Sequence, residues 1–557
     1  MQASENRDTE RPCFEKAKRG FSVFYRGKTL LSRIDPVRQA ERAVEAALPL
    51  SGRTLYLLPS PLFGYGIPLI IENLPLDSSL LCIEADAALA DFSSEYISSL
   101  KISRPDAMRF IQTKSPSAVA GFVRKTWGQR RFRRVEILRL TGGWQLNAEV
   151  YEAEAAMLRK LIATEWSNAM TLSKLGRLYI RNAIRNLILL ASRADAEKLF
   201  FGNRPALVLG AGPSLDDFLN NVKQRPPPEA CVIICADTAL RPLREHGVKP
   251  NLVVTLESQH WNLRDFKGMG DWRVPIAMDL SALPAVNEFL GGETYLFWTR
   301  WTELSLFERL SALKLLPVEL PPLGSVGLSA LSLALLLGTG PVFTAGIDFS
   351  FTLDKYHCRG SPSHSEALAG HTRFGGLYPA SALRARRVCG ALRSDPPMKN
   401  YRDLFEAEFA GCGRVFAIGG GLPLGVEALS YEAALSAMRV AAGGGSISDD
   451  IPHPSTGGDR YPAKVESIYS FIENEQKMLH ELLSILKGEA GTERLDFLLN
   501  AASYLWAHFP DCAGAGGSRP SSSDISFLKR VRVEIEPFIK TWESARRALV
   551  ESAASSS

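Results

Sequence analysis

The sequence lacks the features that would assign it at once to a common class. Its eight cysteines form no CxxC pair, so they indicate neither a zinc site nor a disulfide framework, and their scatter favours a reducing compartment. The first twenty residues are charged and hold no apolar signal segment, which favours a cytoplasmic protein. The longest apolar run, residues 328–338, is too short to span a bilayer, so no membrane span is expected.

Several nucleotide and metal motifs are also missing. The chain has 65 lysines and arginines against 60 aspartates and glutamates, without a basic block interleaved with aromatics, so no nucleic-acid partner is predicted. No GxxxxGK(S/T) loop occurs, which argues against a P-loop kinase or ATPase. No DxD triplet occurs, and His357, His364 and His371 are spaced by seven, which is not a metal-ligand spacing. We therefore expect no metal site and no obligatory cofactor.

The distribution of apolar runs and breakers predicts an α/β protein of several domains. Residues 1–150 show a strand, a glycine turn, a helix and a second strand ending at Glu84 and Asp86, which is typical of a Rossmann-like domain. Residues 151–200 have helical periodicity with almost no breakers and predict two helices that bridge two domains. A catalytic domain at 201–440, a flexible linker at 441–462 and a helical C-terminal domain at 463–557 complete the expected order.

The expected catalytic domain alternates short apolar runs with helical stretches. This rhythm predicts βαβ units and a Rossmann-like, mainly parallel sheet, with strands at residues 206–209, 231–235, 252–255, 274–278, 295–298, 341–344 and 414–417. Ligands of such sheets lie outside the carboxyl ends of the strands. Polar or glycine residues follow five of these runs and should meet at that edge: residues 210–214, Asp237 with Thr238, Glu257, Asp279 and Asp348.

The stretch "PALVLGAGPSLDDFLNN" has the form of a phosphate-binding loop. Gly210 and Gly212 allow close backbone approach, Pro213 stiffens the turn, and Ser214 is a suitable N-cap for the helix that follows. A phosphate would bind the free N–H groups at that helix start. Leu215 stands where a dinucleotide fingerprint has its third glycine, and an ordinary strand-to-helix turn is the alternative.

The other edge residues admit a functional and a structural interpretation. Asp237, Thr238 and Glu257 would contact a ribose or base, although Asp237 could equally cap the next helix. Asp348 would act in chemistry or hold a lid formed by residues 350–400, which are rich in glycine, proline, serine, histidine and arginine. His357 is the candidate general base of that lid, while an ordinary solvated histidine is the alternative.

Three stretches resemble the motility-associated factor (Maf) family. They are "VLGAGPSLDD", "CADTALRPLREHGVKPNLVVTLES" and "GSVGLSALSLALLLGTGPVFTAGIDFSFTLDKYHCRG". "NYRDLFEAEF" to "AIGGGLPLGVEAL" and "LLSRIDPVRQAE" also resemble family segments, so the likeness reaches about three quarters of the chain. The chain departs from the family pattern at Ile347, Phe349 and Asn251, and Ala211 replaces the asparagine of the related sialyltransferase loop.

The resemblance implies a transferase that moves a nonulosonic acid, such as pseudaminic or legionaminic acid, from a CMP donor to Ser/Thr of flagellin. It implies that the loop with Gly210, Gly212, Pro213 and Ser214 holds the donor phosphate, and it requires no metal. The family shares its central domain with an archaeal 6-hydroxymethylpterin pyrophosphokinase, so a diphosphokinase using ATP and Mg²⁺ is the first alternative. A non-catalytic flagellar assembly protein is the second, and a methyltransferase-like N-terminal unit is a third.

Overall fold

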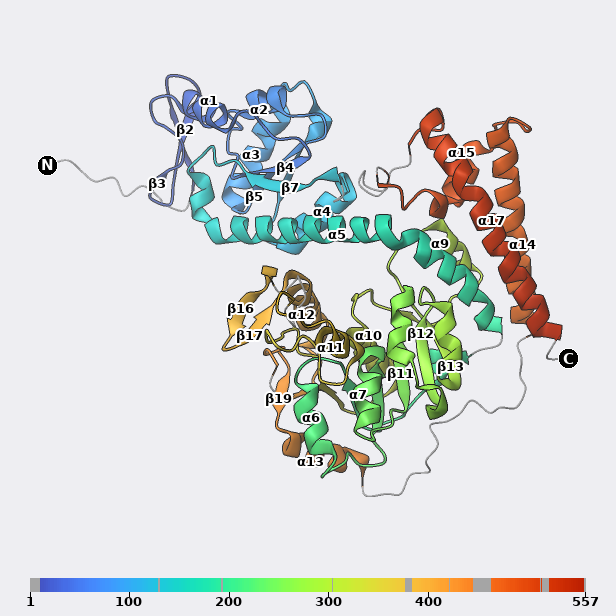
Figure 1. The fold of residues 1–557 in the computed structure, drawn as a ribbon. Helices are drawn as coiled ribbons and strands as arrows, with labels where there is room; N and C mark the ends of the chain where they lie inside the picture. The colour runs from blue at the N-terminus through green and yellow to red at the C-terminus, as the bar shows by residue number, and fades with distance from the viewer. Residues whose placement is uncertain are drawn as a thin grey trace. The chain divides into compact units, whose positions relative to one another are not determined.

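The computed structural model describes residues 11–128, 131–191, 194–302, 304–375, 383–419, 421–443, 462–510, 512 and 520–554. Contacts within the chain define two compact units (Figure 1). The first comprises Met1–Gly176 with Ala507–Ser521, and the second comprises Arg177–Trp506 with Ser522–Ser557. The mixed α/β class expected from the sequence is confirmed in both units.

The first unit contains the predicted Rossmann-like sheet. Four strands lie in the order β6-β5-β4-β7, and every neighbouring pair is parallel. One face of the sheet packs against α1–α3 and the other against α4 and the first half of α5. A small antiparallel sheet, β1-β2-β3, was not predicted. The elements are β1 Cys13–Lys16, β2 Phe21–Tyr25, β3 Lys28–Thr29, α1 Pro36–Ala47, β4 Thr54–Pro59, α2 Ile67–Asn73, β5 Ser79–Glu84, α3 Ala87–Ser99, β6 Met108–Gln112, α4 Pro116–Thr126, β7 Arg134–Ile137 and α5 Ala148–Leu187.

The second unit is built on a ten-stranded sheet in which all pairs are parallel, as predicted. Its order is β14-β13-β12-β11-β10-β9-β15-β18-β19, with β8 beside β13. The strands are β8 Ala194–Asp195, β9 Ala206–Leu209, β10 Val232–Ala236, β11 Leu252–Thr255, β12 Val274–Asp279, β13 Gly291–Thr299, β14 Glu319–Leu320, β15 Val342–Ala345, β18 Val415–Ile418 and β19 Glu427–Leu429. The hairpin strands β16 Arg386–Cys389 and β17 Leu392–Ser394 lie outside it.

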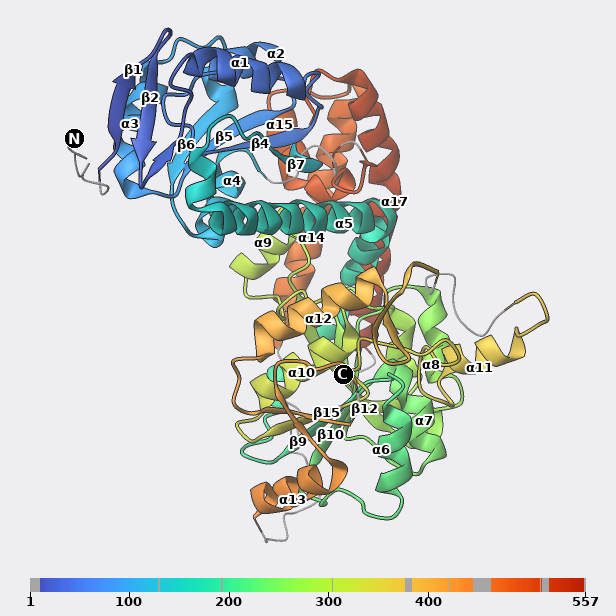
Figure 2. The same cartoon turned by 90° about the vertical axis from the view of Figure 1, so that its left-hand side faces the viewer.

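Helices cover both faces of this sheet because its central strands are apolar on both sides. Within β9, Ala206 and Val208 belong to one core, and Leu207 and Leu209 to the other. The first core is closed by α10 and α12, and the second by α6, α7 and α13 (Figure 2). The helices are α6 Leu215–Val222, α7 Leu240–Glu245, α8 Leu263–Phe266, α9 Ser305–Ala312, α10 Val326–Leu337, α11 Pro362–Ala369, α12 Pro396–Phe409 and α13 Tyr431–Ala442.

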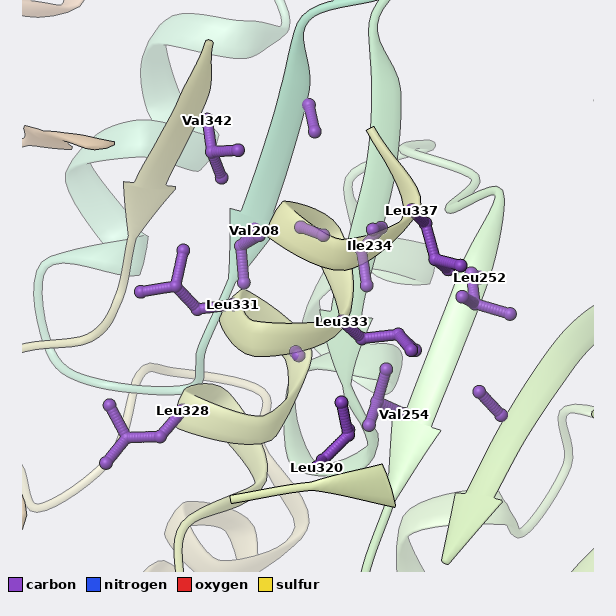
Figure 3. Close-up of a cluster of buried hydrophobic side chains, with 14 of the residues drawn as sticks. Val208, Ile234, Leu252, Val254, Leu320, Leu328, Leu331, Leu333, Leu337 and Val342 are labelled. Carbon is purple, nitrogen blue, oxygen red and sulfur yellow. The ribbon is translucent and has the colours of Figure 1, made fainter. Parts of the chain in front are cut away.

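Helix α10 is the apolar run 328–338 identified in the sequence. Figure 3 shows its leucines, among them Leu328, Leu331 and Leu333, lying against Val208 and Ile234 of the sheet. Such a helix needs no polar face, because it is enclosed by protein on most sides.

The segment 151–200 differs from the prediction of two helices. One continuous helix, α5, spans 40 residues, and the division between the two units falls within it at Gly176. A single glycine in a helix costs only about 1 kcal/mol relative to alanine, so it does not interrupt an otherwise strong helical pattern.

The C-terminal helices α14 Pro462–Lys487, α15 Leu495–Ala501 and α17 Ile525–Ala554 pack together. Arg309 of α9 donates to the buried carboxylate of Glu475 on α14 at 2.8 Å, and Tyr504 donates to the same carboxylate at 3.1 Å. Most of the expected linker, residues 444–461, lies outside the described residues. None of the described helices carries an apolar stretch of the length that a bilayer crossing needs.

Truncation of Leu331 should destabilise the second unit. Leu331 lies on the face of α10 that packs against the sheet, and its side chain is fully buried. Leu331→Ala should therefore lower the free energy of unfolding by about 2–5 kcal/mol and lower the midpoint of urea unfolding. Leu336→Ala on the same helix is the matched control, because Leu336 is 45% exposed. Equal midpoints for the two variants would contradict the assigned packing of α10.

Candidate functional site

The strand order reverses between β9 and β15. From β9 the chain proceeds through β10, β11, β12 and β13, then returns through α10 to place β15 on the other side of β9. Such a reversal is where open α/β sheets bind ligands, because the two loops leave the sheet in opposite directions. The glycine loop 210–214 follows β9, and the loop containing Asp348 follows β15, so both lie at this switch point.

These two loops are bonded to each other. The N–H of Gly212 donates to the carbonyl of Gly346 at 2.8 Å, and the N–H of Ser214 donates to Asp348 Oδ2 at 2.7 Å. The Ser214 hydroxyl donates to Asp348 Oδ1. Ser214 is the N-cap residue of α6, as predicted, but its side chain makes no capping bond to the helix, because it is engaged by Asp348 instead.

Asp348 supplies a negative charge at the start of α6. A carboxylate is favoured there by the N–H groups and dipole of the helix, just as a phosphate would be. Burial raises the pKa of Asp348, while the two hydrogen bonds from Ser214 lower it. The position predicted for a phosphate is thus occupied by a carboxylate of the same chain.

The close contact of the loops requires glycine. A Cβ on Gly212 would lie 2.5 Å from Asp348 Oδ2 and 2.7 Å from the Gly346 carbonyl oxygen. Gly346 itself has a φ of +70°, and Phe349 has a φ of 47°. A non-glycine residue in this conformation stores strain of about 1–3 kcal/mol, which typically occurs at functional sites.

The segment after Asp348 returns over the glycine loop. Lys355 forms an ion pair with Asp216 at 2.7 Å and donates to the Pro213 carbonyl at 3.2 Å. The N–H of Arg359 donates to Asp216 at 2.8 Å, and the N–H of Cys358 donates to the Ala211 carbonyl at 2.9 Å. Residues 355–359 therefore cover the loop, in the position expected of a lid. Residues 376–382 of the expected lid lie outside the described residues.

His357 lies in this covering segment and is half-buried. Its Nδ1 shares a hydrogen bond of 2.9 Å with Ser363 Oγ. Burial, and then the charges of the nearby Arg264 and His364, lower the pKa of His357 to about 4. The imidazole is therefore neutral at pH 7 and able to accept a proton. His371, by contrast, is exposed and bonded to Gly375 at 3.0 Å.

Asp237 follows β10, the strand next to β9, and is 3% exposed. It accepts from the N–H of Thr238 at 2.8 Å and from Thr255 Oγ1 at 2.7 Å. Burial raises the pKa of Asp237, and these hydrogen bonds lower it. Asp237 and Thr238 thus lie at the expected edge, where the carboxylate is held by its own neighbours.

Two residues near Asp237 were missed by the sequence analysis. The side-chain amide nitrogen of Asn262 donates to Asp237 Oδ2 and to Asp265 Oδ2, at 3.1 Å each. Asp265 is 5% exposed, and its Oδ1 has no hydrogen-bond partner among the described residues. Burial first, and then the charge of Asp237, raise the pKa of Asp265 to about 7. The sequence gives only a weak signal for Asn262 and Asp265, namely that both are polar residues of the short helical stretch "WNLRDF".

The remaining acids differ in their surroundings. Glu257 is half-buried after β11 and accepts from the N–H of Gln259 at 2.8 Å. Asp279, after β12, is fully buried and accepts from Ser281 and Thr299, at 2.7 Å from each backbone N–H. These bonds make Asp279 a structural carboxylate, whereas Glu257 remains accessible.

Of the departures from the family pattern, Asn251 lies away from the switch point. Its side chain accepts from the N–H of Ile233 at the amino end of the sheet, at 2.7 Å. Ile347 and Ala211, in contrast, belong to the two loops that meet there, and both are buried.

Replacement of Asp265 should change how stability depends on pH. Its pKa rises from 3.8 to about 7 on folding, so the folded chain binds the proton more tightly and the free energy of unfolding falls as pH rises from 4 to 7. Asp265→Asn should flatten this fall, measured as the melting temperature between pH 5 and 8. Asp271→Asn is the control, because that side chain is 68% exposed. Parallel pH profiles for wild type and Asp265→Asn would contradict the assignment.

Comparisons with known proteins agree with the resemblance seen in the sequence. Residues 181–354 match the family model described as 6-hydroxymethylpterin diphosphokinase MptE-like. An uncharacterized protein of Treponema pallidum (strain Nichols) is 28% identical over 568 residues, covering 95% of this chain and 94% of that protein.

The solved structure of the Maf glycosyltransferase from Magnetospirillum magneticum AMB-1 superposes with a TM-score of 0.53. The superposition covers 97% of this chain and 92% of that chain, at 14% sequence identity. At this identity the likeness shows the fold. The chain thus carries an MptE-like central segment within the fold of a Maf glycosyltransferase, as the resemblance implied.

Proposed function

We propose that the protein transfers a nonulosonic acid, of the pseudaminic or legionaminic type, from a CMP-activated donor to Ser/Thr hydroxyls of flagellin in the cytoplasm. The shared fold with a Maf glycosyltransferase supports a glycosyl transfer. The observation that carries the proposal is the junction of the glycine loop with Asp348 at the switch point of the sheet.

In this proposal the loop from Gly210 to Ser214 receives the donor phosphate. Three of its four N–H groups, those of Gly210, Gly212 and Ser214, donate within the protein. A phosphate can gain the Ser214 N–H and hydroxyl by displacing the carboxylate of Asp348. Burial raises the pKa of Asp348, which means that the carboxylate is disfavoured in its buried position and that its displacement relieves this cost.

Asp237, Thr238 and Glu257 would contact the ribose or base, since their strands β10 and β11 are the next ones along the same edge. Glu257 is the most accessible of these carboxylates. His357, which lies above the loop, would accept the proton of the acceptor hydroxyl. Its neutral form at pH 7 meets the requirement for a base, although a pKa of about 4 makes it a weak one.

A diphosphokinase acting on a pterin is the second candidate, favoured by the MptE-like match of residues 181–354. Such an enzyme would use ATP and Mg²⁺ held by carboxylates. Asp237 and Asp348 are engaged in hydrogen bonds to their neighbours, and no group of three or more His, Cys, Asp or Glu in the described ranges is arranged to hold a metal ion. We rank the diphosphokinase second because the match covers residues 181–354 alone, whereas the fold of the Maf glycosyltransferase covers 97% of the chain.

Gly212→Ala should weaken CMP binding, because its Cβ would lie 2.7 Å from the Gly346 carbonyl oxygen and would push the two loops of the site apart. We expect CMP at 100 times its dissociation constant to stabilise the wild type by about 2.7 kcal/mol and the variant by much less, measured by calorimetry and thermal melting. Gly411→Ala is the matched control, because nothing lies within 4 Å of its added Cβ. Stabilisation by ATP alone would favour the diphosphokinase, and stabilisation by neither nucleotide would favour a non-catalytic role.

His357→Ala should lower sugar transfer by roughly 10²–10⁴-fold and leave CMP affinity nearly unchanged, as expected for loss of a general base. The assay is the mass shift of flagellin in cells with an intact donor pathway. His371→Ala is the control, since that side chain is exposed. If His357→Ala transfers the sugar at the wild-type rate, His357 is not the general base. A transfer rate that falls as pH drops from 8 to 6 would then point to Asp265 as the base, because its pKa is about 7.

A further inference from the structure

A polar cavity lies in the second unit, between two of its long helices. It has a volume of about 400 Å³ and lies between the C-terminal half of α5 and helix α17. Its polar lining consists of Arg181, Arg185, Glu536, Lys540, Thr541 and Ser544. A volume of this size accommodates a small-molecule ligand. None of these residues belongs to the proposed transfer site.

Helix α5 presents three arginines on one face of this region. Arg177, Arg181 and Arg185 follow each other at intervals of four residues, which places them one above another on the helix. Arg177 is paired with Glu534 of α17 at 3.0 Å. Arg181 and Arg185 form no hydrogen bond or ion pair with any other residue that the structure describes, and the Nε of Arg181 is buried.

The electrostatic balance of the cavity is positive. Three cations line it, Arg181, Arg185 and Lys540, against one carboxylate, Glu536. Burial and the charges of Arg185 and Arg177 lower the pKa of Arg181, and Glu534 offsets this only in part. Arg181 is half-buried, and Glu534 neutralises its charge only in part, so an added anion would stabilise it further.

Helix α17 contains a proline where it borders the cavity. Pro537 lies inside the helix and has no N–H for the carbonyl four residues earlier, that of Val533. Both residues line the cavity. The Thr541 hydroxyl donates to the Pro537 carbonyl at 2.9 Å, whereas the Ser544 hydroxyl is exposed at the cavity and can donate to a ligand.

We propose that this cavity between α5 and α17 binds a small molecule carrying two oxyanion groups, such as two phosphates or two carboxylates. Guanidinium groups bind oxyanions through two parallel hydrogen bonds. Arg181 and Arg185 stand one helical turn apart, about 6 Å along the axis, so each can take one anionic group. Lys540 and Ser544 supply further donors from α17. The proposal is independent of the chemistry at the switch point.

The test is calorimetric titration of the full chain with pyrophosphate and with citrate at constant ionic strength, since screening weakens exposed charges. Both probes carry at least two oxyanion groups and should bind the wild type at least tenfold more tightly than inorganic phosphate. Arg181→Gln and Arg185→Gln should each weaken this binding about tenfold or more, because a hydrogen bond to a charged group contributes about 1.5–3 kcal/mol. Arg439→Gln, on the exposed face of α13, is the matched control and should bind like the wild type.

Two further measurements separate this cavity from the proposed nucleotide site and from a loss of fold. Pyrophosphate affinity should survive in Gly212→Ala, and CMP affinity should survive in Arg185→Gln, whose exposed side chain does not support the fold. Unchanged pyrophosphate binding in both arginine variants, or binding lost in Gly212→Ala, would overturn the proposal. Binding of an acidic peptide without binding of either small anion would overturn it as well.

Discussion

The contact between Ser214 and Asp348 is the interaction on which the candidate site depends. It joins the loops that follow β9 and β15 across 134 residues of sequence, at the one place where the strand order of the sheet reverses. Without this contact, the N–H of Ser214 at the start of α6 would be unpaired, and Asp348 would be a buried carboxylate without donors. Leaving either group without a partner costs free energy. Each group is therefore satisfied only if the other loop is in place.

Neighbouring features adapt to this contact. Gly212 and Gly346 have no room for a side chain because the loops approach at backbone distance. Phe349 takes a left-handed conformation immediately after Asp348, which turns the chain back toward α6. Lys355 then neutralises Asp216 in the first turn of that helix. The covering segment, with His357 in it, is thereby held over the glycine loop by bonds to the same few residues.

The sequence predicted the parts of this arrangement that depend on local pattern. The run at Ala206–Leu209 and the glycines after it were identified as strand and turn, and the parallel sheet followed from the alternation of runs and helices. The pairing of Ser214 with Asp348 depends on which strands become neighbours, and no local pattern encodes that; Ser214 was accordingly assigned to helix capping. Asp265 was missed for a related reason, since the pKa of an aspartate on a short helix is raised only when folding buries it beside Asp237.

The antiparallel strands near the N-terminus and the unbroken α5 were missed because short polar strands and single glycines give weak signals.

The charges at the switch point set a condition on any anionic ligand. Asp348, Asp237 and Asp265 are all buried there, while Arg264 is paired with Glu366 at 2.7 Å. A phosphate therefore cannot simply be added to the loop, because it would lie against the carboxylate of Asp348 at the start of α6. Two cations of the covering segment lie beside the loop: Lys355, which contacts the Pro213 carbonyl, and Arg359, whose side chain is 81% exposed and lies 3.9 Å from Asp216. A phosphate that exchanged with Asp348 would draw on these two cations, so the geometry of the loop and the charge of the covering segment would act together.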